Sequence, residues 1–332
     1  MKIYSFQVFL IAFFSKNEIS LPLNSKHLIM RKILFLILGL SLSQSVVSQD
    51  TLVRKNSAGE NEKWVMSFGD DFEGTKLDES KWRIIEGIPR DPMQGSNYVW
   101  YLRENVEVSQ GLLKLVLKND TMIDRPYDIW IKDGMKPFKG NATHSSGEIN
   151  SRESFGFGMY EIRCRIPKSK GLNSAFWMYG EKDGVNNEID VFEYWDVKGP
   201  FKMMYSEKRL SKWHNMTAHY KGGMSIEGYL GEDISEGFHT FTCIWDECKI
   251  EWWVDGDLKR TMYRYKGMKG RAKQCVDFLK KKKKPEETPF PRDPMQIITN
   301  VSVKKTPDGP DKPNLFPQSM DIDYIRYYKK ID

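Results

Sequence analysis

The sequence predicts an all-β fold, a β-sandwich of two antiparallel sheets, on three observations. Short stretches rich in β-branched and aromatic residues recur along the chain. Clusters of Gly, Asn and Asp separate these stretches, as turns separate strands. No long stretch combines a helical period with capping residues. Many strands at short spacing in one domain-sized chain are typical of a two-sheet sandwich. The expected strands are Leu112–Leu117, Phe157–Ile166, Ser174–Tyr179, Glu188–Trp195, Phe238–Trp245, Ile250–Val254, Met295–Val303 and Met320–Tyr328.

Two stretches depart from simple alternation. Ile250–Val254 carries large side chains on both faces of the strand, and a solvent-side face that still carries Trp is a candidate ligand surface. Residues 266–288 break the strand pattern, so we expect a loop or insertion there. The five lysines of Lys280–Lys284 within it are expected to form a solvated face.

The amino-terminal region predicts export. Residues 30–32 are Met-Arg-Lys, Ile33–Leu42 is apolar, and small residues follow at Val46 and Ser48. This pattern predicts a leader over residues 1–48 that contains a signal peptide, with translation beginning at Met30 and the protein secreted or periplasmic. The apolar run is too short to span a bilayer, so we expect no stable membrane insertion. Residues 49–332 are expected to form a single catalytic domain, because no repeat or linker divides them.

The charge balance narrows the choice of partner. The formal net charge of the 332 residues is +6, and the lysine run alone supplies five positive charges. A nucleic-acid partner is not expected, because basic residues are not spread over a recognisable binding module. An anionic polysaccharide is compatible with this charge. We expect the protein to be a monomer.

The cysteines give no metal-binding spacing. The four residues after the leader are Cys164, Cys243, Cys248 and Cys275, which allow three full disulfide pairings. Export permits disulfides, so we expect these cysteines to be structural or without a role.

The stretch Asn187–Trp195 is the most informative. In a regular strand, Glu188 and Asp190 share one face and Glu193 points into the core, where a carboxylate is costly. One extra residue between Asp190 and Glu193, a β-bulge, turns Glu193 back to the face of the other two acids. The sequence therefore predicts three acids on one face of an apolar strand.

Glycoside hydrolysis explains three such acids. A retaining mechanism needs a nucleophilic carboxylate and an acid/base carboxyl about 5–5.5 Å apart. Asp190, by its charge and hydrogen bonding, would raise the pKa of a neighbouring glutamate and orient the nucleophile. Spacing alone does not fix which glutamate has which role. Other interpretations are an edge strand whose acids face water, or a metal site, although no His lies within this stretch.

The run Glu-Ile-Asp-Val-Phe-Glu resembles the Glu-x-Asp-x-x-Glu signature of glycoside hydrolase family 16 in its β-bulge form. The resemblance implies that Glu188 is the nucleophile and Glu193 the acid/base, and it extends over roughly residues 64–330. Seven further matches occur in the family's order around this run: Asp70–Gly74 with Lys81-Trp82, Ser146–Ile149, Gly158–Arg163, Ala175–Met178, Trp252–Gly256, Pro294–Asn300 and Met320–Arg326.

The resemblance implies a β-jelly roll whose concave sheet forms an open cleft that cuts inside polysaccharides, as laminarinases, agarases and carrageenases do. No cofactor is required for that reaction. Some family members hold a calcium ion on the convex side, and the matching positions here are Gly111 and Asp323. The alternative for Asp323 is an ordinary exposed acid on an edge strand.

Four residues are candidates for binding the sugar. Trp177 and Trp195 flank the catalytic strand and could stack on sugar rings, although either could belong to the core. The resemblance suggests His219 as a cleft-side histidine on the next strand, and it suggests Trp100 as a further substrate-binding aromatic residue.

The substrate is an open choice between two polymer classes. The stretches Gly171–Ser174 and Ser96–Tyr101 depart from the motifs that β-1,3-glucanases of the family usually carry. A Trp at position 100 and the basic charge resemble members that act on red-algal galactans, which we favour slightly over β-glucan. A transglycosylase using the same intermediate and a non-catalytic carbohydrate-binding protein of the same fold are further alternatives.

Overall fold

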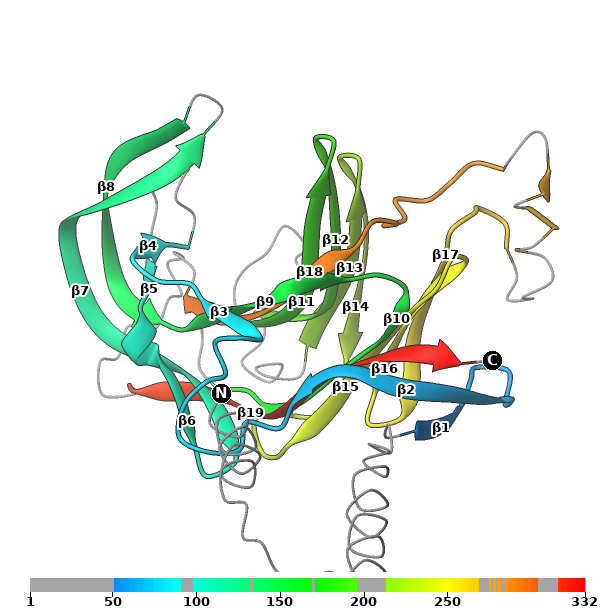
Figure 1. Cartoon of the computed structure of the whole chain (residues 1–332), viewed down its shortest axis with the longest axis horizontal. Helices are drawn as coiled ribbons and strands as arrows, with labels where there is room; N and C mark the ends of the chain where they lie inside the picture. Colours follow the sequence, from blue (N-terminus) through cyan, green and yellow to red (C-terminus); the bar gives the residue numbers. More distant parts are fainter. Residues whose placement is uncertain are drawn as a thin grey trace, which may run out of the picture. The chain divides into compact units, whose positions relative to one another are not determined.

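The computed structural model confirms an all-β fold of two sheets (Figure 1). It describes residues 51–331 except 91–97, 132–133, 169–170, 196–212, 269–274, 276, 279, 282–284 and 304–315. The expected leader and its start at Met30 therefore lie outside the described residues, as does most of the lysine run. No described helix is long and apolar enough to cross a membrane. Asp50–Asp332 cluster as one compact unit.

The smaller sheet carries the predicted catalytic strand near its middle. Its order is β14 (Gly223–Leu230), β13 (Trp213–Tyr220), β12 (Val185–Trp195), β11 (Leu172–Lys182), β18 (Met295–Val303), β9 (Glu148–Phe155) and β3 (Trp82–Ile84). All these neighbours pair antiparallel, as predicted. Side chains directly opposite each other in such pairs share a face, so the register determines which residues line the sheet's open side.

The larger sheet has twelve strands. Its main path runs β17 (Asp257–Tyr263), β16 (Lys249–Val254), β15 (His239–Trp245), β10 (Gly158–Arg165), β19 (Gln318–Ile331), β7 (Leu112–Ile131), β8 (Gly134–Ser146), β5 (Val99–Tyr101) and β4 (Ile88–Pro89). Beside this path lie β1 (Thr51–Lys55), β2 (Asn61–Asp70) and β6 (Val106–Ser109), and a short 3-10 helix spans Arg103–Asn105. The short pair of β5 with β8 is parallel.

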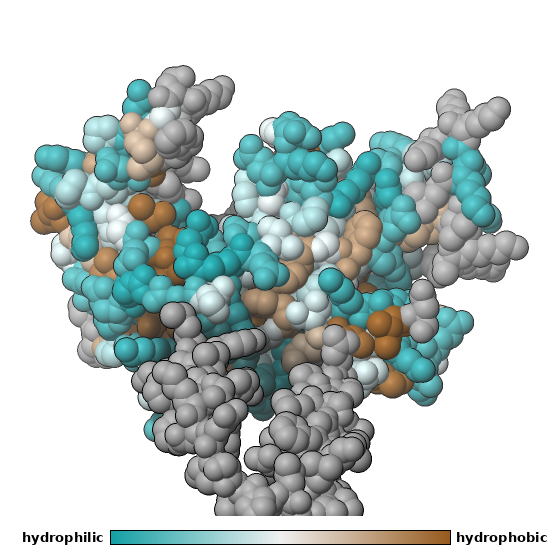
Figure 2. All heavy atoms as spheres, viewed as in Figure 1, coloured by the Kyte–Doolittle hydropathy of each residue, from teal (hydrophilic) through white to brown (hydrophobic). Residues whose placement is uncertain are grey.

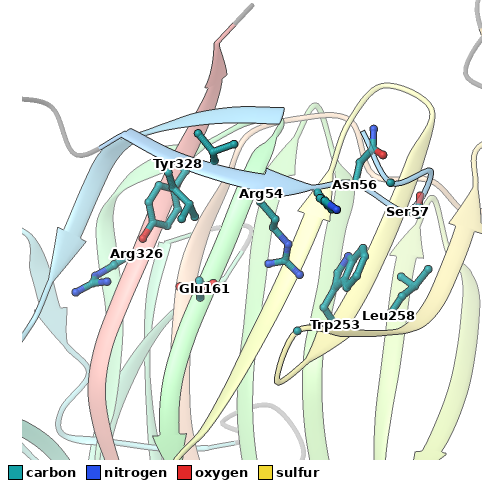
Figure 3. A pocket seen from close by; sticks show the side chains of 13 residues that line it. Arg54, Asn56, Ser57, Glu161, Trp253, Leu258, Arg326 and Tyr328 are labelled. Atoms are coloured by element: carbon teal, nitrogen blue, oxygen red, sulfur yellow. The ribbon is translucent and has the colours of Figure 1, made fainter. Parts of the chain in front are cut away.

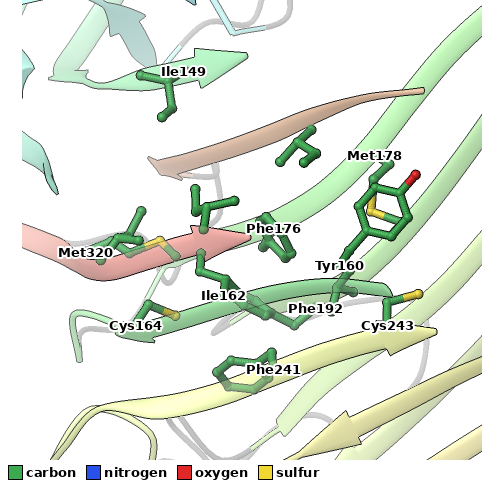
Figure 4. Close-up of a cluster of buried hydrophobic side chains, with 14 of the residues drawn as sticks. Ile149, Tyr160, Ile162, Cys164, Phe176, Met178, Phe192, Phe241, Cys243 and Met320 are labelled. Atoms are coloured by element: carbon green, nitrogen blue, oxygen red, sulfur yellow. The ribbon is translucent and has the colours of Figure 1, made fainter. Parts of the chain in front are cut away.

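The main core fills the space between the two sheets (Figure 4). Phe176 and Phe192 of the smaller sheet meet Phe241 of the larger one, and the ring centroids of Phe192 and Phe241 lie 4.5 Å apart. Burial of such aromatic side chains is the main stabilising contribution in a sandwich. One sheet face is therefore fixed against the core, and the opposite face of the smaller sheet is left for function.

Three smaller hydrophobic clusters lie apart from this core, and two of them belong to the larger sheet. One gathers Trp100, Tyr127 and Met122 around strands β5, β7 and β8. The other, which includes Trp64, Met159 and Trp253, lies on the face of the larger sheet that points away from the core. Figure 2 shows apolar side chains gathered near β1, where Leu52 and Val53 are exposed.

The predicted insertion follows β17. Residues 264–268 and 285–294 form no strand of either sheet, and the described residues between 275 and 280 are helical. A small cluster of Tyr265, Met268 and Cys275 packs here with Phe278, and a disulfide joins Cys248 to Cys275. This bridge is one of the pairings that the sequence left open, and Cys164 and Cys243 are free and buried.

Candidate active site

The bulge predicted in the acidic strand is present in β12. Phe192 pairs with Phe176 and Asp190 pairs with Trp177, so Val191 is the extra residue. Val191 and Phe192 are both buried in the core. The strand therefore turns Glu193 onto the face of Glu188 and Asp190, because an inserted residue reverses the alternation beyond it.

The register shows what surrounds the three acids. On β13 their partners are His219, Thr217 and Asn215, opposite Glu188, Asp190 and Glu193 in that order. On β11 the partners in the same order are Tyr179, Trp177 and Ala175. Hydroxyl, amide, imidazole and aromatic groups thus border the acids, a composition suited to binding a sugar's hydroxyl groups and its apolar ring faces.

Burial differs sharply among the acids. The side chain of Asp190 is 3% exposed, whereas that of Glu188 is 28% exposed. Burial, followed by the charge of Asp190, raises the pKa of Glu188 to about 8. Burial and the charge of Glu193 raise the pKa of Asp190 well above its usual range. The charge of Asp190 therefore favours the protonated form of Glu188, in the direction that the sequence predicted.

His219 lies on the same face. Its Nε2 atom is 3.5 Å from Oδ2 of Asp190 and 3.8 Å from Oε1 of Glu188, and its side chain is 34% exposed. The structure thus brings together Glu188, Asp190 and His219, which the sequence placed on two separate strands. The lateral pairing of Glu188 with His219 accounts for this proximity.

Trp177 is half-buried beside Asp190, and a chain of buried polar residues holds its ring. Its indole N–H donates to Oδ1 of Asn300 at 3.0 Å, and Nδ2 of Asn300 donates to the hydroxyl of Tyr101 at 3.0 Å. The Tyr101 hydroxyl in turn bonds the carboxyl of Glu148. Sequence reasoning missed Asn300, Tyr101 and Glu148. A polar Asn inside the apolar strand Met295–Val303 was the available signal for the first of them.

Two further aromatic residues, Trp100 and Trp195, were predicted to bind the sugar. Trp100 was expected in the cleft, but this expectation is wrong, because the side chain is fully buried against Tyr127 in the separate cluster of β5, β7 and β8. A ring without exposed surface cannot stack on a sugar. Trp195 ends β12, and its side chain lies outside the described residues, so its role stays a prediction.

The calcium site expected at Gly111 and Asp323 stays a prediction. The Asp323 carboxylate on β19 accepts a hydrogen bond from the Arg163 guanidinium, so it is paired with a cation of the protein itself. Gly111 lies in the turn before β7 with a φ of +70°, which a glycine adopts without strain.

A hollow of about 790 Å³ lies away from the three acids, on the face of the larger sheet that points away from the core (Figure 3). The guanidinium of Arg54 lies 4.5 Å from the ring centre of Trp253 there. The acid that lines this hollow is Glu161, whose carboxylate accepts hydrogen bonds from Thr242 and Tyr324. A single, fully paired carboxylate does not supply the two groups that glycoside hydrolysis requires. The acids of β12 therefore remain the candidate catalytic site.

Comparisons with known proteins identify the family of this chain. The family model of Glycosyl hydrolases family 16 matches residues 94–326, which include all three acids. The chain is 27% identical over 284 residues to Glucan endo-1,3-beta-glucosidase A1 of Niallia circulans, covering 79% of this chain but 37% of that protein. It is 26% identical over 306 residues to Kappa-carrageenase of Pseudoalteromonas carrageenovora, covering 86% and 70%. The laminarinase catalytic domain from Thermotoga maritima superposes with a TM-score of 0.59 at 24% identity, covering 81% and 99%.

Proposed function

Because this chain belongs to family 16 of the glycosyl hydrolases, we propose that it is a retaining endo-β-glycosidase that cuts internal bonds of a polysaccharide. The observation that carries the proposal is the bulged strand β12, which presents Glu188, Asp190 and Glu193 on the sheet face opposite the core. A structural strand would gain no stability from acids at these positions, since burial of Asp190 opposes its charge.

In the proposed reaction Glu188 attacks the anomeric carbon while Glu193 protonates the leaving oxygen. The bond from carbon to the leaving sugar breaks and a covalent glycosyl-enzyme forms at Glu188. Glu193 then takes a proton from water, whose oxygen displaces Glu188, so that the configuration at the anomeric carbon is retained. The Asp190 carboxyl shares a hydrogen bond with Glu188 and so orients it. Trp177, fixed by Asn300, provides a ring face for the sugar beside the acids.

The substrate that we favour is a red-algal galactan, with β-1,3- or mixed-linkage glucan as the alternative. Register places Arg83 in one row with Asn150, Ile298, Trp177 and Asp190, so the row crosses the open face from the acids to β3. Four strand spacings of about 4.8 Å separate β12 from β3, or roughly 19 Å. Arg83 is exposed at the far end of the row, where it can meet a substituent of a long polymer.

The positive charges of Arg83 and Arg90 favour an anionic polymer as the substrate. Arg83 and Arg90 both act on the carboxyl of Glu148, and burial raises the pKa of Glu148 to about 7. Near neutral pH this one partly protonated carboxyl does not balance two guanidinium groups, which are well suited to bind a sulfate ester. The similarity to a kappa-carrageenase supports the same choice, while the similarity to a glucan endo-1,3-beta-glucosidase supports the alternative.

The test is a reducing-sugar assay of residues 49–332 on laminarin, mixed-linkage glucan, agarose, porphyran and the carrageenans. A Glu188→Gln protein is the control. We expect release from a sulfated galactan, loss of release in the control, and a higher KM for Arg83→Gln on the sulfated polymer alone. Release from laminarin only would establish the glucanase alternative. Binding without release, equal in both proteins, would establish a carbohydrate-binding protein.

We also propose that the protein is exported through the signal within residues 1–48. The disulfide between Cys248 and Cys275 supports this, since such bonds persist mainly in oxidising compartments. Mass spectrometry of the amino terminus of the protein recovered outside the cytoplasm tests it. A mature terminus at Gln49 is the expected result, and an intact leader in the cytoplasmic fraction contradicts it.

A further inference from the structure

Residues 285–294 lead from the insertion to β18 and bond to both sheets on the way (Figure 1). The indole N–H of Trp245, on β15 of the larger sheet, donates to the backbone carbonyl of Pro291 at 3.2 Å. The next residue, Arg292, donates its backbone N–H to Oδ1 of Asn187 at 3.0 Å. Asn187 lies on β12, so two successive residues of this segment join the larger sheet to the strand that carries the three acids.

The side chain of Asn187 is fully buried and uses both ends of its amide. Its Oδ1 also accepts from the backbone N–H of Asp293 at 3.4 Å, and its Nδ2 donates to Oδ2 of Asp293 at 3.4 Å and to the carbonyl of Val185 at 3.3 Å. The Asp293 carboxylate in turn pairs with Lys182 of β11 at 3.2 Å. Loss of the Asn187 amide would leave buried backbone N–H groups without an acceptor, which water cannot readily replace there.

The same segment lies close against the hairpin of β11 and β12. The register pairs Asn187 with Gly180 of β11, and a Cβ atom at Gly180 would lie 2.5 Å from the carbonyl oxygen of Pro294. Only glycine permits this approach of backbone to backbone. On the other side, the guanidinium of Arg292 lies 5.1 Å from the ring centre of Tyr220, the partner of Asn187 on β13. The segment therefore contacts three neighbouring strands at the level of Asn187.

Glu188 follows Asn187 directly, so the two side chains leave β12 on opposite faces. Asn187 meets the segment, and Glu188 meets His219 on the open face, at 3.8 Å. A nucleophilic carboxylate has to lie about 5–5.5 Å from the acid/base carboxyl. A displacement of about 1 Å, even by a change far from the chemistry, can cost about 10²-fold in rate. Whatever holds the backbone at Asn187 therefore affects the attack by Glu188.

We propose that Asn187 is a positioning residue. Through its bonds to residues 292–293 it holds this part of β12 in the place from which the Glu188 carboxylate reaches the anomeric carbon. The inference rests on the proposed function, because it depends on the role of Glu188 as nucleophile. Loss of the contact should slow the attack by Glu188 and leave the protonation of the leaving group by Glu193 unaltered.

The variant Asn187→Ala tests the proposal on two substrates, the polymer and an aryl glycoside with a good leaving group. The value of kcat/KM reports the steps up to formation of the glycosyl-enzyme on each. Both substrates need the nucleophile, whereas only the polymer needs strong acid assistance. We expect kcat/KM to fall by about 10–100-fold, and by a similar factor on both substrates. A loss confined to the polymer overturns the proposal.

Asn105→Ala is the matched control. Asn105 is another fully buried asparagine, and its Nδ2 donates to the carbonyl of Val116 at 2.9 Å and to Oγ of Ser145 at 3.0 Å, within the larger sheet. Circular dichroism and urea unfolding identify conditions in which both variants are folded. We expect both to unfold at lower urea than the unmodified protein, and only Asn187→Ala to lose kcat/KM. Equal losses of kcat/KM in the two variants overturn the proposal.

Asp293→Ala decides the question if Asn187→Ala does not fold. The Asp293 side chain is 25% exposed, and its removal leaves both backbone amides bonded to Oδ1 of Asn187. We expect a loss of a few-fold, again alike on both substrates, and an unaltered kcat/KM overturns the proposal. Absence of turnover by the unmodified protein contradicts the proposed function, and the inference with it.

Discussion

Trp252 of β16 donates its indole N–H across the core to the backbone carbonyl of Asp190, at 2.9 Å. The bond joins the larger sheet to the strand that carries the three acids, at the residue next to the bulge. A bulge leaves backbone groups without their ladder partners, and here a side chain from the opposite sheet satisfies one of them. The core therefore helps to determine the geometry of the candidate active site.

Replacing this indole should loosen the bulge. We expect Trp252→Phe to lower the free energy of unfolding by about 1–3 kcal/mol, because a buried carbonyl loses its donor, and to lower kcat as well. Urea unfolding and steady-state kinetics measure both. Trp253→Phe is the matched control, since the Trp253 indole N–H has no partner among the described residues. Equal losses in the two variants would contradict the special role of Trp252.

The assignment of Glu193 as acid/base predicts dependence on the leaving group. Glu193→Gln should reduce kcat/KM on the polymer by roughly 10²–10⁴-fold, the usual contribution of a general acid, and much less on an aryl glycoside with a good leaving group. Initial rates on both substrates give the ratio. Glu153→Gln, at an exposed position of β9, controls for loss of a carboxylate. If both substrates suffer alike, Glu193 is not the acid.

The buried contacts of Asn300 predict an effect on binding. Asn300→Leu keeps the volume but removes the acceptor of the Trp177 indole and the donor to Tyr101. We expect KM to rise by about tenfold, equivalent to about 1.4 kcal/mol of lost binding, with a smaller change in kcat. Tyr101→Phe leaves the Trp177 bond intact and should raise KM less. A KM unaltered by Asn300→Leu would show that Trp177 is held by packing alone.

His214 predicts sensitivity to acid. Burial lowers the pKa of His214 to about 3, and both ring nitrogens lack hydrogen-bond partners among the described residues. As pH falls below about 6.5, the unfolded chain binds a proton here that the folded protein does not bind. The free energy of unfolding should thus fall by up to about 1.4 kcal/mol per pH unit between about pH 6.5 and 3.

The variant His214→Phe should remove that contribution, because Phe cannot bind a proton and fits among the rings of Tyr194 and Phe241. Urea unfolding from pH 8 to pH 4 gives the slope for each protein, and the carboxylates common to both cancel in the difference. Parallel slopes would mean that His214 becomes protonated without unfolding.

The disulfide predicts a local gain in stability. Cys248 and Cys275 are 27 residues apart in sequence, and closing a loop of that length stabilises the fold by about 3–4 kcal/mol in the chain-entropy account. Cys248→Ser with Cys275→Ser should therefore lower Tm by several degrees, as measured by scanning calorimetry. Dithiothreitol should lower Tm of the unmodified protein similarly and leave that of the double variant unchanged. An unaltered Tm in the double variant would contradict the prediction.

Local spacing was sufficient to predict the acidic strand. Glu188, Asp190 and Glu193 lie within six residues, and the cost of burying Glu193 alone indicated the bulge that β12 contains. The two-sheet architecture followed in the same way from the frequency of strands. Such features depend on neighbours in sequence, which the sequence displays directly.

Features that depend on distant pairing could not be predicted. Trp100 belongs to a three-residue strand whose partner β8 is more than forty residues away, so alternation gave no sign that its ring is buried. Asn300 and Tyr101 are 199 residues apart in sequence. The pairing of Asp323 with Arg163 follows from the register of β10 and β19, which the sequence does not display.

The separate cluster of β5, β7 and β8 divides the chain into regions that need not unfold together. Trp100, Tyr127 and Met122 are buried among themselves and not against the main core. Amides of the outer part of the β7–β8 hairpin should exchange with solvent hydrogen through openings that leave the sandwich folded. Changes in hairpin length there alter the rim of the protein without disturbing the packing around β12.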